Sequence, residues 1–352
     1  MSNILADSIN EINEIEDLLS KEMPTYRQAY SDRTAWIMSC ISELSYIKFN
    51  ELFPGKAKEY FIQKLSDLID DDKKSSLFKL IELVDYDPQK EKQKLEENTA
   101  FLGMHLVETF DNNGTQAILL ENDTSLFLGF RGTEPTSIKD IKSDTKATTI
   151  ACESGGKIHS GFSEAFNQIA IEVQQTLNKE QFSKKPLFIT GHSLGGALAT
   201  IAAKKITHNG GIAACYTFGS PRAGDIDWFT NIKTPIYRLV NAADPVTMLP
   251  PGSETIGLFA WGSKFIPYFG KSIRGWLLSK FNGYYHGGNM RYLTNCTKQD
   301  YSQTKLLYSV SFFFRIKAFI VKKMPWKKVL ADHSISIYRK KLRIIACARQ
   351  NL

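Results

Sequence analysis

The sequence predicts an α/β fold in which a mostly parallel central sheet is flanked by helices and preceded by a helical N-terminal extension. Two patterns predict it. From residue 100 onward, short apolar strands alternate with segments of helical periodicity, which is typical of a parallel sheet with helices on its faces. Residues 1–98 instead read as mostly helical. The 352 residues are 43% hydrophobic and 23% charged, as in globular proteins, and they suffice for one large domain or two ordinary ones.

The N-terminal region, residues 1–98, is expected to pack on the core as a helical unit. Apolar residues recur on one face of residues 12–19, and again over 37–47 after a helix start signal at Ser31. Residues 89–97 form a charged stretch that is either a linker or an exposed helix.

The second unit, residues 99–352, is expected to carry the sheet, with aromatic and basic insertions at about 257–285 and 303–330. In chain order we expect strands at 101–108, 115–121 and 125–130, a helix at 161–177, a strand at 187–190, a helix at 197–206, and strands at 212–218 and 236–240.

The charge is distributed unevenly along the chain. Residues 301–352 hold 12 Lys and Arg against one acid, a net +11, so a total of +7 leaves −4 for the rest. Such asymmetry predicts a basic tail directed at an anionic surface, either lipid or nucleic acid. No helix-turn-helix, zinc or RNA-binding motif accompanies the charge, so we expect no nucleic-acid partner.

Targeting signals and cysteine patterns are inconspicuous. No apolar run approaches the roughly 18 residues of a membrane-spanning helix, and residues 1–17 lack the pattern of a signal peptide. We therefore expect a cytoplasmic or peripheral membrane location, with secretion independent of a signal peptide as the open alternative. The five cysteines lie far apart and at no metal-ligand spacing, so we expect no metal site.

The motif that carries chemistry is G-x-S-x-G at residues 191–195. It follows an apolar strand and precedes a helix-forming segment, the setting of a nucleophile elbow. The glycines permit the tight turn that exposes Ser193 above the sheet. The backbone N–H of Leu194, at the start of the helix, would then point at a developing oxyanion.

A serine nucleophile needs a base and an orienting acid, which follow it in the chain order Ser, acid, His. Asp244 comes just after a buried strand, where α/β sheets gather their sites, whereas Asp225 and Asp227 are better read as loop or capping groups. Of the histidines after Ser193, His208 ends the elbow helix and is expected to be solvated. The residues alone leave His286 and His333 as candidate bases.

A second oxyanion donor is expected after an earlier strand, at Phe130-Arg131-Gly132-Thr133. Gly132 lets the backbone approach, and Thr133 offers both an N–H and a hydroxyl.

Together these stretches resemble the class 3 lipase family, the fungal triacylglycerol lipase-like branch of the α/β hydrolases. The matching blocks are residues 130–133, 158–162, 191–197, 217–222 and 241–246, followed by Asp332-His333-Ser334 and Tyr338.

The resemblance implies an α/β-hydrolase fold with Ser193 as nucleophile, Asp244 as acid and His333 as base. It implies an oxyanion hole of Thr133 and Leu194, no cofactor, and hydrolysis of lipid esters, either acylglycerols or phospholipids. It assigns a supporting role to His159 and a non-catalytic segment to His286. The alternative is a catalytically silent lipase-fold scaffold that binds partners.

The chain departs from the family between Asp244 and His333, which are 89 residues apart. Residues 259–285 and 305–328 interleave aromatic with basic side chains, which suits either an anionic lipid interface or extra covering helices. The usual lid segment, residues 135–141, is poor in large apolar residues. Residues 259–285 are therefore expected to cover the acyl chain instead.

Overall fold

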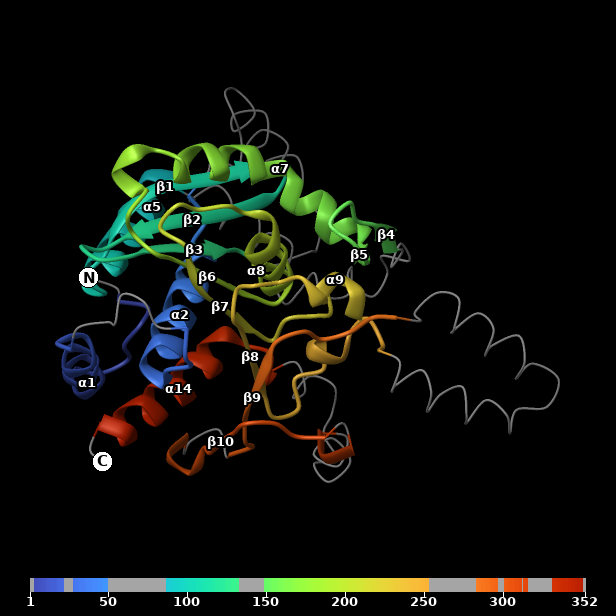
Figure 1. Ribbon diagram of the computed structural model, residues 1–352. Coiled ribbons are helices and arrows are strands. Elements are labelled where there is room, and N and C mark those ends of the chain that lie inside the picture. Colours follow the sequence, from blue (N-terminus) through green and yellow to red (C-terminus); the bar gives the residue numbers. More distant parts are fainter. Residues whose placement is uncertain are drawn as a thin grey trace, which may run out of the picture.

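The computed structural model describes residues 3–21, 28–49, 87–132, 149–252, 283–296, 301–311, 313–315 and 331–350. Its centre is an eight-stranded sheet with the strand order β1-β2-β3-β6-β7-β8-β9-β10 (Figure 1). The strands are β1 His105–Asn112, β2 Thr115–Glu121, β3 Leu126–Phe130, β6 Leu187–His192, β7 Ile212–Phe218, β8 Ile236–Asn241, β9 Asn289–Leu293 and β10 Leu306–Leu307.

Parallel pairing dominates the middle of this sheet. The four pairings from β3 through β9 are parallel, whereas β1, β2 and β3 form an antiparallel meander and β10 pairs antiparallel with β9. Two short strands, β4 (Thr149–Ala151) and β5 (Lys157–His159), form a separate antiparallel ribbon. The carboxyl ends of β6, β7 and β8 consequently meet at one edge of the sheet, where α/β proteins place their sites.

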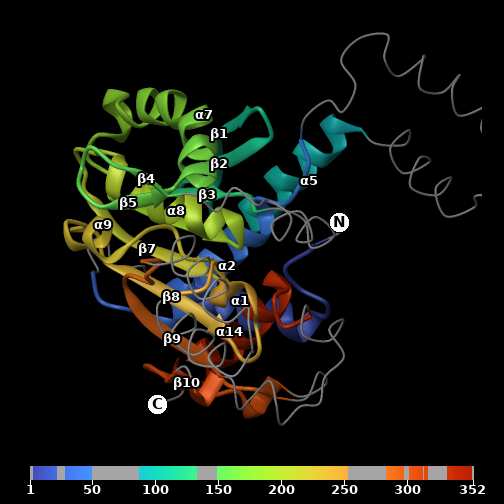
Figure 2. The same ribbon diagram turned by 90° about the vertical axis from the view of Figure 1, so that its right-hand side faces the viewer.

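Helices cover both faces of the sheet. On one face, α7 (Ser160–Leu177) and α8 (Leu194–Lys205) enclose one apolar core, and on the other α1 (Ile9–Leu19), α2 (Asp32–Leu44) and α14 (Ile335–Gln350) enclose a second (Figure 2). Strand β2 shows why two cores form. Its residues Ala117 and Leu119 join the first core while Ile118 and Leu120 join the second, because successive side chains of a strand point to opposite faces.

The N-terminal region is part of this packing. Helix α2 begins at an N-cap whose Ser31 side chain accepts from the N–H of Thr34, and most of the helix is buried against the sheet. The charged stretch at 89–97 lies within a helix, α5 (Pro88–Phe101), which starts at the Asp87 cap with proline at its first position. A short helix, α9 (Ile226–Thr230), follows β7.

The basic residues of α14 do not form an exposed tail. All five of its cations have partners within the fold, four of them with acids of the N-terminal region. The ion pairs are Arg339–Glu43, Lys340–Asp7, Arg343–Glu11, Arg343–Glu14 and Arg349–Asp32. The fifth cation, Lys341, donates to the side chain of Asn241 and to the carbonyl of Thr294. The cations of this helix are thus paired within the fold, and the expectation of a basic tail facing an anionic surface stays a prediction.

The predicted α/β-hydrolase architecture is confirmed, with a shift at one boundary. A strand was expected at 101–108, but α5 continues to Phe101 and β1 begins at His105. The chain reverses between them through Gly103, whose φ of +69° suits glycine. Strands β4, β5, β9 and β10 and helix α14 were not expected. In the part of the chain that the structure describes, no helix is long and apolar enough to cross a bilayer.

Candidate active site

Ser193 occupies the turn between β6 and α8. Its backbone has φ 57° and ψ −129°, a strained conformation for a residue with a side chain, and its N–H donates to the carbonyl of Phe218 over 2.9 Å. Glycine is required on both sides of the turn. A Cβ on Gly191 would collide with the backbone of Gly195, and a Cβ on Gly195 would collide with the carbonyl of Phe130. The elbow therefore depends on glycine at these two positions.

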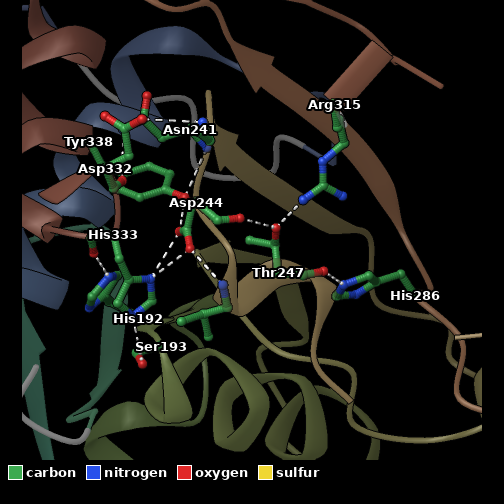
Figure 3. Close-up of polar contacts among 12 residues, drawn as sticks. His192, Ser193, Asn241, Asp244, Thr247, His286, Arg315, Asp332, His333 and Tyr338 are labelled. Carbon is green, nitrogen blue, oxygen red and sulfur yellow. Dashed lines mark hydrogen bonds and ion pairs between the residues drawn. The ribbon is translucent and has the colours of Figure 1, made fainter. Parts of the chain in front are cut away.

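Three side chains form a continuous hydrogen-bonded line at this turn (Figure 3). The Nε2 of His333 lies 2.9 Å from the Oγ of Ser193. The Nδ1 of the same ring lies 3.0 and 2.9 Å from the two carboxylate oxygens of Asp244. All three side chains are buried, at 0% exposure for Ser193, 1% for His333 and 0% for Asp244. The arrangement has the geometry expected of a nucleophile, a base within proton-transfer distance and an acid that orients the base.

The carboxylate of Asp244 is fixed by two further donors. The N–H of Val246 donates to Oδ1 over 2.9 Å, and the hydroxyl of Tyr338 donates to Oδ2 over 2.6 Å. Burial, and then the charge of Asp244, raises the pKa of Tyr338 well above its ordinary value, so its hydroxyl remains a donor. Gly219 leaves room for the pair. At its φ of +57°, a Cβ would lie 2.6 Å from Oδ2 of Asp244 and 2.9 Å from Nδ1 of His333.

The segment that carries the base is tied to the end of β8. The side-chain amide of Asn241 donates to the carbonyl of Asp332 over 2.8 Å, and the N–H of Ala243 donates to the carboxylate of Asp332 over 3.2 Å. The N–H of Asn241 also donates to the oxygen of Tyr338 over 2.9 Å. The loop that carries Asp244 and the loop that carries His333 are therefore joined by side-chain-to-backbone hydrogen bonds as well as by the Asp244–His333 contact.

The two expected oxyanion donors differ in how far the structure describes them. Leu194 is the first residue of α8, so its N–H has no acceptor in a preceding helical turn. Thr133 lies outside the described residues, but its neighbour Gly132 sits against the elbow. A Cβ on Gly132 would lie 3.2 Å from the Cβ of Ser193 and would collide with the carbonyl of His192. The chain thus passes the nucleophile immediately before Thr133.

The competing candidates lie elsewhere. The Nε2 of His286 contacts the carbonyl of Thr247 at 2.7 Å, and burial lowers the pKa of His286 well below its ordinary value. Asp225 caps α9 by accepting from the N–H of Trp228, and Asp227 lies within the first turn of that helix.

Two further histidines, His159 and His208, have structural contacts. His159 caps α7, with its Nδ1 accepting from the N–H of Phe162 at 3.4 Å, and its ring stacks on Phe162. His208 is half-buried rather than solvated, and its Nε2 contacts the carbonyl of Lys185 at 2.7 Å.

Several residues at the site were missed by sequence reasoning. His192 and Tyr46 contact each other and reach the base-bearing segment. Arg315, from the second insertion, is buried and donates to the hydroxyl of Thr247, which in turn donates to the carbonyl of Asp244 over 3.0 Å. Only the place of His192 inside the elbow motif was a usable signal, because the partners of the others lie far away in the chain.

Two predictions fall on residues that the structure does not describe. The segment at 135–141 and residues 253–282, which include most of the proposed acyl cover, lie outside the described ranges. Within those ranges, no group of three or more His, Cys, Asp or Glu side chains is arranged to hold a metal ion.

Comparison with known proteins finds similarity to lipases over part of the chain. Residues 127–254, which include Ser193 and Asp244, match the family model described as Lipase (class 3). The chain is 39% identical over 104 residues to a secreted mono- and diacylglycerol lipase of Fusarium solani, covering 28% of this chain and 31% of that protein. It is 30% identical over 154 residues to a lipase of Rhizomucor miehei, covering 40% of this chain and 42% of that one. Each match spans less than half of the relative.

Solved structures of fungal lipases resemble the chain more loosely. A Rhizomucor miehei lipase in complex with its propeptide gives a TM-score of 0.46 at 18% identity, covering 87% of this chain and 74% of that one. A triacylglycerol lipase described as having a serine protease triad gives 0.47 at 20% identity, covering 79% and 84%. The fold assignment rests on the strand order and the elbow. Over residues 127–254, the chain is similar in sequence to class 3 lipases.

Proposed function

We propose that this protein is a serine hydrolase that cleaves carboxylic esters of lipids with Ser193 as nucleophile, His333 as base and Asp244 as orienting acid. The observation that carries the proposal is the buried line from the Ser193 hydroxyl through the His333 ring to the Asp244 carboxylate, placed on a strained elbow. Geometry of this kind is the recognised signature of nucleophilic acyl transfer.

The chemistry follows from these positions. As Oγ of Ser193 attacks the ester carbonyl, Nε2 of His333 accepts its proton, and Asp244 stabilises the resulting imidazolium. The carbonyl oxygen becomes negative and faces the N–H of Leu194, with Thr133 as the proposed second donor. His333 then gives its proton to the leaving alcohol, and an acyl-enzyme remains. Water, deprotonated by the same ring, releases the fatty acid and restores Ser193.

The substrate class is proposed from the family and from the surface near the second insertion. The Fusarium relative is named for mono- and diacylglycerol hydrolysis. In this chain, the exposed aromatic side chains Tyr308, Phe313 and Phe314 lie in that insertion, with exposures of 61%, 70% and 49%. Exposed aromatic rings favour the headgroup level of a lipid surface. We therefore propose peripheral contact with lipid, with acylglycerols and phospholipids as the substrate candidates.

Burial of the nucleophile adds a requirement. Because Ser193 and His333 are almost inaccessible, part of the chain over the site must move before an ester reaches Oγ. The same burial is the one observation that favours the second candidate, a silent lipase-fold scaffold that binds partners.

The test uses wild type and Ser193→Ala with vesicles of phosphatidylcholine, phosphatidylglycerol and triacylglycerol, and identifies released products by mass spectrometry. Serine-dependent release of lysolipid and fatty acid would identify a phospholipase and the ester that it cuts. Serine-dependent release of diacylglycerol would identify a neutral lipase. Equal product from both proteins, or none from either, would contradict the proposed hydrolase and favour the scaffold.

A further inference from the structure

His192, the residue before the nucleophile, contacts the backbone of the base. Its Nε2 lies 2.6 Å from the carbonyl oxygen of His333, and the two rings have centroids 4.5 Å apart (Figure 3). Its Nδ1 lies 2.8 Å from the hydroxyl of Tyr46. Only 3% of His192 is exposed. Both ring nitrogens are therefore engaged inside the protein.

The partners of His192 fix its tautomer. A carbonyl oxygen can only accept, so Nε2 of His192 carries the proton and donates it to His333. The lone pair of Nδ1 then accepts from the Tyr46 hydroxyl. Burial, and then the nearby charge of His333, lowers the pKa of His192 well below its ordinary value, which keeps the ring neutral. His192 therefore donates to the carbonyl of His333 and accepts from Tyr46.

Tyr46 brings the N-terminal region to the site. It lies just past the end of α2, and a Cβ on Gly132 would collide with its hydroxyl. Gly132 in turn lies against the elbow and precedes the proposed oxyanion donor Thr133. Tyr46 therefore touches both His192 and the segment that approaches the oxyanion.

The backbone of the base is consequently held from two sides. On one side, Asn241 donates to the carbonyl of Asp332. On the other, His192 donates to the carbonyl of the next residue, His333. Because His192 is covalently adjacent to Ser193, its contact sets the elbow and the base at a fixed separation, and displacement of about 1 Å can cost ~100-fold in rate.

We propose that Tyr46 and His192 are positioning residues that hold the His333 backbone against the nucleophile elbow, so that the N-terminal region takes part in catalysis. The inference rests on the proposed hydrolase function. It assigns to residues 28–49 a role in the alignment of the base in addition to their role in the core.

The experiment measures hydrolysis of p-nitrophenyl butyrate, a soluble ester, by the full chain. Turnover is divided by the number of reactive serines, counted by labelling with a fluorophosphonate. We expect His192→Leu to lower kcat per reactive serine by ~100-fold while KM stays within about 2-fold. His192→Gln, whose amide can donate from about the same place as Nε2, should recover most of that loss.

A double-mutant cycle tests the connection to Tyr46. Tyr46→Phe alone should lower kcat by ~5- to 10-fold, and it should have no further effect in the His192→Leu background, because it acts through His192. The matched control is His208→Leu. His208 also contacts a carbonyl through Nε2, but beside Lys185 at the opposite end of β6, and its kcat should equal that of wild type.

The outcomes separate this inference from the proposed function. If wild type is active and His192→Leu keeps its kcat per reactive serine, the positioning role is refuted while the hydrolase stands. The role is equally refuted if Gln is no better than Leu, or if the two single effects simply multiply. If His192→Leu does not fold, a wild-type kcat for Tyr46→Phe refutes the role. If wild type is neither labelled nor active, both proposals fail.

Discussion

The nucleophile and the base reach the same point by different routes. Ser193 is placed by one strand, one turn and one helix, all within residues 187–205, and its position depends on glycines two residues away on either side. His333 is placed by contacts that come from β8, from the elbow and, through α14, from the N-terminal region. The comparison shows that local backbone geometry is enough for the nucleophile, whereas the base needs most of the fold.

The two faces of the sheet differ in the same way. Hydrophobic packing dominates under α7 and α8, on the side of the elbow helix. On the opposite side, α14 is held by charge as well as by packing. Arg339, only 1% exposed, donates to Glu43 and to the carbonyls of Ile4 and Leu5. The helix that follows His333 is therefore held by residues near the start of the chain, at positions 4, 5 and 43.

The largest expected effect is a loss of turnover, which should be similar whether Ser193 or His333 is replaced. Ser193→Ala or His333→Ala should each lower kcat by on the order of 10⁴-fold or more, because members of such a triad act as a unit. His286→Ala should cost far less, since its contact is to the carbonyl of Thr247. Steady-state kinetics on one soluble ester checks the ranking, and a larger loss for His286→Ala would reverse the assignment of the base.

Removing a charge from α14, the helix that follows His333, should lower the free energy of unfolding more than removing an exposed charge elsewhere. Arg339→Met leaves Glu43, whose side chain is 16% exposed, without its partner, and breaking a largely buried pair in this way costs up to about 3–5 kcal/mol in the free energy of unfolding. The matched change Lys90→Met removes an exposed pair with Asp87, 3.8 Å apart, and should cost no more than about 1 kcal/mol. Urea titration measures both. Similar costs for the two variants would show that α14 is not held by this charge.

A methyl group added at Gly219 should displace Asp244 and His333 from each other. Gly219→Ala should lower kcat by ~100-fold, because its Cβ would press on Asp244 and His333. Gly114→Ala provides the control, since Gly114 also has a positive φ, of +80°, but a Cβ there meets nothing within 4 Å. Both variants should lose about 1–2 kcal/mol of stability from backbone strain, and only Gly219→Ala should lose turnover. Equal activities would mean that the pair can shift without consequence.

The smallest expected effect is a pH dependence of stability near the acid. Above about pH 6.5, His286 is neutral in both the folded and the unfolded chain. Below that value the unfolded chain binds a proton that the folded chain does not, because burial and the charges of Arg238 and Arg222 lower the pKa of His286. Stability is therefore lost as the pH falls, by up to ~1.4 kcal/mol per pH unit.

His286→Gln removes this term while keeping an amide donor for Thr247. Its stability should fall less than that of wild type between pH 7 and pH 5, as measured by urea titration at each pH. His105→Gln, at an exposed histidine, controls for surface charge. If wild type and His286→Gln lose stability in parallel, His286 is not the group responsible.

The sequence predicted those parts of the site that are determined by residues close together in the chain. The glycines of the elbow, the strand before Ser193 and the strand before Asp244 are all encoded within a few residues of the side chain that they place. The choice between His286 and His333 was not local, because it depends on how the long segment after Asp244 folds back. The family resemblance, and not the pattern of residues, favoured His333.

The contacts that could not be predicted from the sequence all join residues that lie far apart in the chain. The cations of α14 suggested an exposed basic surface because their acidic partners, such as Glu11 and Glu43, lie at the other end of the chain. Tyr46 carried no signal, and His192 carried none beyond its place in the elbow motif, because a hydrogen bond between residues 146 positions apart leaves no spacing to recognise. Long-range contacts of this kind hold the base-bearing segment and were invisible from the residues alone.

The most direct test of the central claim is to label the intact protein with a fluorophosphonate and to locate the adduct by peptide mass spectrometry. The claim that Ser193 is activated by His333 predicts one adduct, on Ser193, formed quickly in wild type. It predicts labelling at least ~100-fold slower in His333→Ala at equal folded fraction. An adduct on another residue, or equal labelling rates for wild type and His333→Ala, would contradict it.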